Sequence, residues 1–135
     1  LKYELVFFYN VFGPGQIING KMSAVIGTFE KLYKKRKPLT IVKPGTQKRD
    51  FTHIDDIVKG CYLAMIKGRQ NEYMLCTNKS YSIIQIAKMF NTKIKFIKMR
   101  PGDRFGSTTI NNNAEKILGF KAIKDIKTYI GNLIK

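Results

Sequence analysis

YELVFFY, residues 3–9, is a nearly unbroken run of apolar, β-prone residues that stops before the turn Gly13-Pro14-Gly15. A run without polar alternation is typical of a strand buried on both faces, as in a parallel sheet covered by helices. Further strands are expected, in chain order, at residues 39–42, 49–54, 72–77 and 93–98. Between them, apolar residues recur at three- and four-residue spacing, which predicts helices. Because strands and helices interleave along the chain, the predicted fold class is α/β.

Capping residues mark where the expected helices begin and end. Short polar side chains accept hydrogen bonds from the unpaired N–H groups of a helix start, and glycine or proline ends a helix. The starts are assigned to Ser23, to Asp55 or Asp56, and to Ser82 with Gln85 three residues later. The ends are assigned to Pro38, Gly68 and Gly119, and two of the helices are expected near residues 112–118 and 123–133.

The length and composition limit the class of protein. The 135 residues amount to one domain or to a piece of a larger protein, and a composition of 44% hydrophobic and 25% charged residues suits a packed core rather than a disordered tail. No apolar run approaches the roughly 18 to 20 residues of a membrane-spanning helix, so we expect no membrane partner. No charged segment followed by an apolar one opens the chain, which favours a cytoplasmic location. Cys61 and Cys76 lie among apolar neighbours, which favours reduced, buried thiols.

The chain is strongly basic, with 25 Lys and Arg against nine Asp and Glu and a net charge of +16. This excess of positive charge is by itself a reason to consider polyanion binding as a function. Only five of the basic residues are arginine, however, and the lysines are spread over the whole chain. The one dense run, residues 34–37, falls where a helix should end, and cations suit a helix carboxyl terminus. We therefore expect no specific nucleic-acid partner, with a basic nucleic-acid-binding module as the alternative.

Three polar clusters lie at strand ends or in the loops that follow, where α/β proteins build sites. They are Asn10 with Gly13-Pro14-Gly15, then Arg49-Asp50, then Arg100 with Asp103. A carboxamide can donate to a phosphate or sugar oxygen, and a guanidinium offers a planar fork to two phosphate oxygens. Arg100 and Asp103 could hold a nucleotide at two points, phosphate and ribose. A strand-ending turn and ordinary surface ion pairs would produce the same residues.

Other candidate catalytic groups favour structural roles. His53 is the only histidine, and a half-buried strand histidine is a better interpretation than a general base. Asp55 and Asp56 are adjacent, so their side chains diverge, and helix capping explains them better than metal binding or acid–base work. The sequence has no GxGxxG, no P-loop and no acidic cage, so no metal is expected.

Taken in order, these segments resemble the carboxy-terminal half of the extended short-chain dehydrogenase/reductases that act on nucleotide sugars, the family of UDP-glucose 4-epimerase. The matching segments are FYNVFGPGQ (8–16), MSAVI (22–26), PLTI (38–41), GTQKRDFT (45–52) with IDD (54–56), RPGD (100–103) and KILGF (116–120). The resemblance spans essentially all of residues 1–135. It implies the last strands and helices of a Rossmann-type sheet in residues 1–22 and 57–91, and a nucleotide-sugar-binding subdomain in residues 23–56 and 92–135.

The resemblance also implies roles for individual residues. Tyr9 would lie beside the nicotinamide end of NAD, and Asn10 would hydrogen-bond the diphosphate of a nucleotide sugar. Arg49 and Arg100 would bind the same diphosphate, and Asp103 the ribose. The backbone groups that would face the base belong to Thr40, Ile41 and Val42.

Several departures from the family pattern are visible. Phe7 stands where the family usually has arginine, Gly27 where it has proline, and Lys43-Pro44-Gly45-Thr46 where it has Gly-Asp-Gly-Thr. The glycine-rich loop and the catalytic Ser/Thr and Tyr-x-x-x-Lys of the family are absent, since the only such spacing, Tyr33 to Lys37, lies at an expected helix end. The chain is therefore expected to carry no catalytic residue.

The resemblance predicts a substrate-binding fragment of an NAD-dependent nucleotide-sugar 4-epimerase, with a UDP-hexose as substrate and no turnover by the chain alone. A dTDP- or UDP-sugar 4,6-dehydratase and a UDP-glucuronate decarboxylase are alternatives within the family. A stand-alone sugar-nucleotide-binding module is the non-enzymatic alternative. We also expect a homodimeric parent protein, and self-association of this chain through exposed strand edges.

Overall fold

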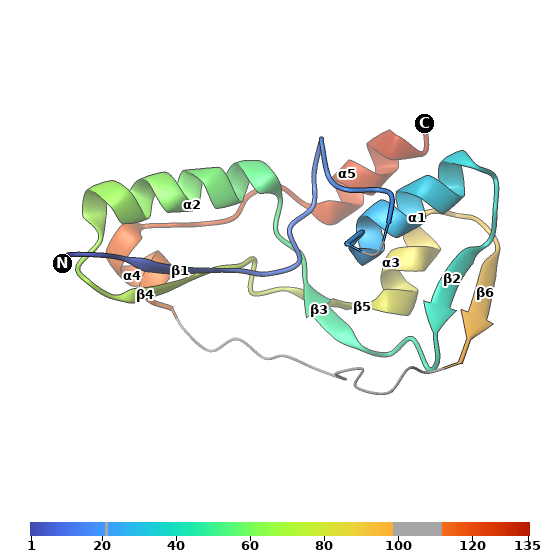
Figure 1. Ribbon diagram of the computed structural model, residues 1–135, viewed down its shortest axis with the longest axis horizontal. Helices are drawn as coiled ribbons and strands as arrows, with labels where there is room; N and C mark the ends of the chain where they lie inside the picture. The colour runs from blue at the N-terminus through green and yellow to red at the C-terminus, as the bar shows by residue number, and fades with distance from the viewer. Residues whose placement is uncertain (21, 99–111) are drawn as a thin grey trace.

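The computed structural model describes residues 1–20, 22–98 and 112–135, in which strands and helices alternate along the chain (Figure 1). The strands are β1 (Leu5–Phe8), β2 (Leu39–Val42), β3 (Lys48–Asp50), β4 (Glu72–Leu75), β5 (Ser80–Ser82) and β6 (Ile94–Ile97). The helices are α1 (Val25–Lys34), α2 (Ile54–Lys67), α3 (Ile83–Met89), α4 (Asn113–Leu118) and α5 (Ile126–Leu133). The predicted α/β class is confirmed. Among the described residues, no helix is long and apolar enough to cross a membrane.

The described strands form three two-stranded sheets. β1 pairs in parallel with β4, and Leu5 lies opposite Glu72. β2 pairs in parallel with β6, and β3 pairs antiparallel with β5. The two parallel pairs confirm the parallel sheet geometry expected from the first strand. The expected strand at 49–54 is shorter, because β3 ends at Asp50 and only a single bridge, from Phe12 to His53, follows it.

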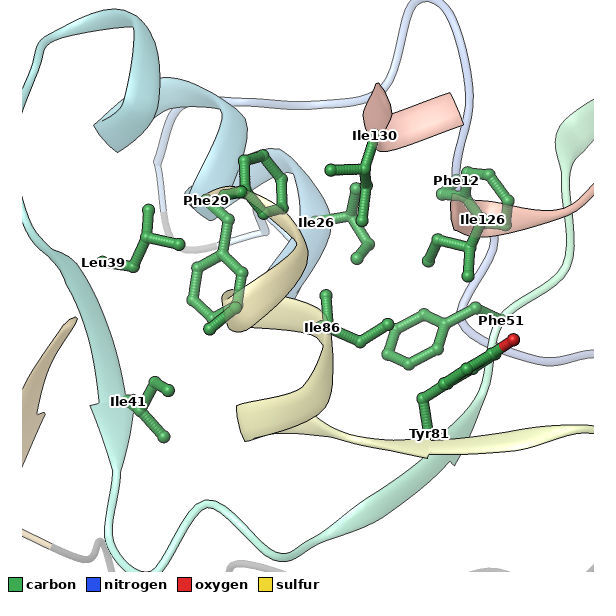
Figure 2. Close-up of a cluster of buried hydrophobic side chains, with 12 residues drawn as sticks. Phe12, Ile26, Phe29, Leu39, Ile41, Phe51, Tyr81, Ile86, Ile126 and Ile130 are labelled. Carbon is green, nitrogen blue, oxygen red and sulfur yellow. The ribbon is translucent and has the colours of Figure 1, made fainter. Parts of the chain in front are cut away.

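Two clusters of buried apolar side chains hold these elements together. The first lies among α1, β2, α3 and α5 and includes Phe12, Phe29, Ile41, Phe51, Ile86, Phe90 and Ile130 (Figure 2). The second lies among α2, β4 and α4 and consists of Ile57, Ala64, Tyr73, Leu75, Ala114, Leu118 and Phe120. In Figure 1 the two groups of elements lie at opposite ends of an elongated molecule, with β3 and β5 between them.

β1 is more exposed than its apolar sequence predicts. Leu5 is 41% exposed, Phe7 37% and Phe8 53%. A strand buried on both faces needs a neighbour on each edge and a covering layer on each face. Among the described residues β1 has one strand neighbour, β4, and the expectation of full burial is wrong for this reason.

Two of the expected helix starts are wrong. α1 begins after Ala24, which makes no side-chain cap, and the Ser23 hydroxyl instead lies 3.1 Å from the hydroxyl of Thr28. α2 is capped by His53, whose Nδ1 accepts a hydrogen bond from the backbone N–H of Asp55 at 3.1 Å. Asp55 and Asp56 lie in the first turn of α2, where a carboxylate stabilises the helix by its attraction to the positive end of the helix dipole.

Three other local signals are confirmed, whereas α1 already ends at Lys34, before Pro38, and α5 begins at Ile126 rather than at residue 123. Ser82 and Gln85 form the expected capping box at the start of α3. Gly119 ends α4 in the left-handed conformation, with φ of 66°. Gly68 is the C-cap of α2.

Candidate functional site

A pocket of about 190 Å³ lies between the start of α1, β2, β3 and the start of α3. Its lining includes Thr40, Ile41, Val42 and Arg49, four residues that the sequence assigns to substrate binding. Val25, Gln47 and Ile83 complete it. The structure thus brings residues from two separate strands to one cavity.

Arg49 reaches this pocket from β3, where it lies opposite Tyr81 of β5. Its side chain is half-buried, and Nη1 donates to the carbonyl oxygen of Lys48 at 2.8 Å. A guanidinium has five N–H donors, so Arg49 can keep this backbone bond while it binds another group. The geometry suits a cation that is held at the wall of a cavity.

Gln47 is a pocket residue that the sequence analysis did not single out. It is only 6% exposed, and its Oε1 atom has no hydrogen-bond partner among the described residues. Buried polar atoms are nearly always paired, so this oxygen is suited to accept a hydrogen bond from a ligand or water in the pocket. Strand periodicity is the signal that could have found it, because Gln47 and Arg49 are two residues apart and share a face.

Asn10 lies beside the end of β3 and does not line the pocket. Its Nδ2 donates to the carbonyl oxygen of Asp50 at 2.8 Å, which joins the end of β1 to the end of β3. The amide has a second N–H that could still donate to a ligand. Tyr9, immediately before Asn10, is half-buried and also lies outside the pocket lining.

The carboxylate of Asp50 holds the segment that carries Arg49. Oδ1 accepts from the backbone N–H of Thr77 at 3.0 Å and from its hydroxyl at 2.7 Å, and Oδ2 accepts from the N–H of Lys79 at 3.1 Å. Asp50 is 6% exposed. This aspartate therefore has a structural role, fixing the β4–β5 connection against β3.

Asp55 and Asp56 also have structural partners. Asp56 is 2% exposed, and its Oδ2 accepts from the backbone N–H groups of Ile123 and Lys124 at 3.1 and 2.9 Å. Asp55 forms an ion pair with the Lys124 ammonium, whose hydrogen bond lowers the pKa of that carboxyl. Neither carboxylate lines the pocket.

Two thiols lie among the described residues, and neither suits nucleophilic chemistry. Burial raises the pKa of Cys61 and of Cys76, which keeps both in the protonated form at neutral pH. Both are free, and Cys76 is buried as expected, whereas Cys61 is only partly buried. Arg100 and Asp103 lie outside the described residues, and their roles stay predictions.

Comparison with known proteins identifies the family. The model of the NAD dependent epimerase/dehydratase family matches residues 1–87. The chain belongs to this family. A curated relative, the UDP-glucuronate 4-epimerase of Thermodesulfobacterium geofontis, is 40% identical over 60 residues, which cover 44% of this chain and 17% of the relative.

Solved structures of the family share the fold. UDP-glucose 4-epimerase of Thermotoga maritima, solved with UDP-glucose, superposes with a TM-score of 0.91 at 24% identity over 99% of this chain and 45% of that one. UDP-N-acetylglucosamine 4-epimerase of Methanobrevibacter ruminantium, in complex with UDP-N-acetylmuramic acid, superposes with a TM-score of 0.88 at 26% identity. The match covers 99% of this chain and 44% of that one. The chain therefore spans less than half the length of each of these relatives, and its fold is the Rossmann-type fold of this family.

The family is NAD dependent, yet the residues of this chain do not make an NAD site by themselves. The sequence has no GxGxxG, the glycine-rich turn at which a Rossmann domain binds the pyrophosphate. Tyr9 is the single residue that the resemblance places beside NAD.

Proposed function

We propose that this chain is the nucleotide-sugar-binding part of an NAD-dependent UDP-sugar 4-epimerase, and that the pocket lined by β2, Gln47 and Arg49 holds the nucleotide. The observation that carries the proposal is the convergence of Thr40, Ile41, Val42 and Arg49 on one cavity. The relatives support the substrate class, because their names specify UDP-sugars.

Each wall of the pocket offers a different kind of interaction. In the part of the chain that the structure describes, β2 pairs only with β6, so alternate backbone N–H and C=O groups of residues 39–42 point to the opposite edge, where a base can bind. Gln47 Oε1 accepts a hydrogen bond from an N–H or O–H of the nucleotide. The Arg49 fork binds diphosphate oxygens, and Asn10, Arg100 and Asp103 are proposed to complete the binding of diphosphate and ribose.

Binding of UDP tests the proposal. Arg49→Ala is expected to weaken UDP binding roughly 10- to 100-fold, because it removes charge-assisted hydrogen bonds to phosphate, and Gln47→Leu roughly 10-fold. Isothermal titration calorimetry of the purified chain measures both. Arg69→Ala is the matched control, since Arg69 is exposed in the turn between α2 and β4.

Two results would contradict this assignment: no UDP binding by the wild-type chain at millimolar concentration, or equal weakening by Arg69→Ala and Arg49→Ala. The same samples should not convert UDP-glucose to UDP-galactose, because the 135 residues of this sequence include no Tyr-x-x-x-Lys in the position expected for the catalytic pair.

We also propose that the chain self-associates through β1. The strand leaves one edge unpaired among the described residues and exposes Leu5, Phe7 and Phe8. Light scattering at high concentration should give a mass above that of the monomer, and Phe7→Lys should shift the distribution toward the monomer by adding a charge at the edge. Val58→Lys, an equal change at a 61% exposed position on α2, should not. A monomeric wild type would rule this association out.

A further inference from the structure

A second and larger cavity, of about 570 Å³, lies where α1 and α5 end and β6 begins. Its walls include Tyr33, Arg36 and Pro38 from the end of α1 and its following turn, Lys93 before β6, and Leu133 at the end of α5. These segments meet at one end of the molecule (Figure 1). The volume falls within the roughly 300 to 1,000 Å³ of small-molecule sites. No lining residue is shared with the proposed nucleotide pocket.

The cavity has an excess of positive charge. Arg36 and Lys93 form no ion pair with any residue that the structure describes, and Lys34 is paired with Glu30 at 2.6 Å. The ends of α1 and α5 contribute about half a negative charge each. Two unpaired cations in the lining outweigh that contribution, and Lys35 and Lys37 flank Arg36 in the sequence. The cavity therefore attracts an anion.

Part of the wall beside these cations is apolar, and its Tyr33 side chain is held in place by two contacts. The Tyr33 ring packs against Phe90 of the first core cluster, with the ring centroids 5.9 Å apart. Its hydroxyl donates to the carbonyl oxygen of Ile134 at 3.3 Å, which ties α1 to α5. A preformed wall reduces the entropy lost when a ligand binds. Tyr33, Pro38 and Leu133 thus offer a surface to the organic part of a ligand.

From this combination we propose that the cavity is a binding site for an organic polyphosphate, separate from the nucleotide pocket. The Arg36 guanidinium binds two oxygens of one phosphate, and the Lys93 ammonium acts as a point charge on the next. The organic part of the ligand packs on Tyr33 and Pro38. A concave site with an apolar wall favours such a molecule over the rigid backbone of duplex DNA.

The test uses ATP as the probe at about 0.15 M salt, where diffuse surface charge is screened beyond roughly 8 Å. The backbone-amide NMR chemical shifts of residues around Tyr33 and Lys93 should change with ATP concentration and reach a plateau. The double variant Arg36→Gln with Lys93→Gln should bind ATP roughly 10-fold or more weakly, because charge-assisted hydrogen bonds to phosphate are lost.

Lys59→Gln with Lys116→Gln is the matched control, since it removes the same charge from exposed positions on α2 and α4. This control should leave ATP affinity unchanged. Arg49→Ala should retain ATP binding, and the Arg36/Lys93 variant should retain UDP binding, so this proposal and the proposed function can fail separately.

Four outcomes would overturn the proposal. The first is an absence of saturable ATP binding. The second is equal weakening by the control variant, which would indicate diffuse charge. The third is inorganic tripolyphosphate binding as tightly as ATP, since the apolar wall would then contribute nothing. The fourth is a short DNA duplex binding more tightly than ATP with the same dependence on Arg36 and Lys93, which would make this face a nucleic-acid surface.

Discussion

Asp50→Ala is expected to lower the free energy of unfolding by about 3 kcal/mol, because it removes a buried carboxylate that accepts several partly buried hydrogen bonds. Besides the Thr52 hydroxyl, which donates to Oδ1 at 3.5 Å, the carboxylate accepts hydrogen bonds from two backbone N–H groups and one hydroxyl that belong to Thr77 and Lys79. These partners lie 27 and 29 residues away along the chain. Asp50 therefore fixes a long-range connection, and alanine can offer none of these bonds.

Urea denaturation followed by circular dichroism measures this loss as a shift of the unfolding midpoint. Asp50→Asn keeps the shape but replaces one acceptor oxygen by an N–H₂ donor, so it should be destabilising to a smaller extent. Thr77→Val keeps the backbone N–H donor but removes the hydroxyl, which donates to Asp50 and accepts from the N–H of Lys79, and should cost about 1 kcal/mol. Asp55→Asn, at an exposed carboxylate, should leave the midpoint near that of the wild type. An Asp50→Ala midpoint equal to that of Asp55→Asn would contradict the structural role.

Asp50 also affects the proposed nucleotide pocket, because it holds the strand that carries Arg49. Asp50 follows Arg49 on β3, and its carbonyl oxygen accepts the hydrogen bond from Asn10. Displacing this segment would move Arg49 relative to β2. The folded fraction of Asp50→Asn is therefore expected to bind UDP more weakly than the wild type, although Asp50 itself does not line the pocket.

Features that depend on a few neighbouring residues could be predicted from the sequence. The capping box of Ser82 and Gln85 closes within four residues, so its spacing alone specifies it. Gly119 ends α4 for an equally local reason, since glycine adopts the left-handed conformation without strain. The parallel pairing of β1 was predictable from its apolar run, whereas the expected burial of β1 was wrong because it depends on covering elements outside the run.

Features that depend on partners far along the chain could not be predicted in this way. Asp55 or Asp56 was expected to cap α2, but His53 caps the helix, and the Asp56 carboxylate accepts from Ile123 and Lys124, 67 and 68 residues away. Strand periodicity could place Gln47 on the face of Arg49, but its burial in the pocket depends on β2 and α3, which lie elsewhere along the chain. Spacing along one segment holds no information on which distant segment covers it.

Phe29→Ala is expected to lower the free energy of unfolding by about 3 to 5 kcal/mol, the usual cost of removing a buried aromatic ring. Phe29 is 1% exposed in α1, at the centre of the first core cluster (Figure 2). Its ring meets that of Phe90 edge to face, at a centroid distance of 5.9 Å. The cavity left by alanine would lie between α1 and α3, where neither backbone can close it without losing other contacts.

The matched control for this core substitution is Phe8→Ala, at a 53% exposed position on β1, which should cost less than about 1 kcal/mol. Thermal unfolding with UDP titration then separates stability from binding. Phe29 does not line the nucleotide pocket, so the folded Phe29→Ala chain should bind UDP within about threefold of the wild type, as expected for separate sites. Arg49→Ala should show the reverse, near-native stability with weakened binding. If both variants lost stability and binding together, the pocket and the core would form one inseparable unit, and the assignment of Arg49 to ligand binding would lose its support.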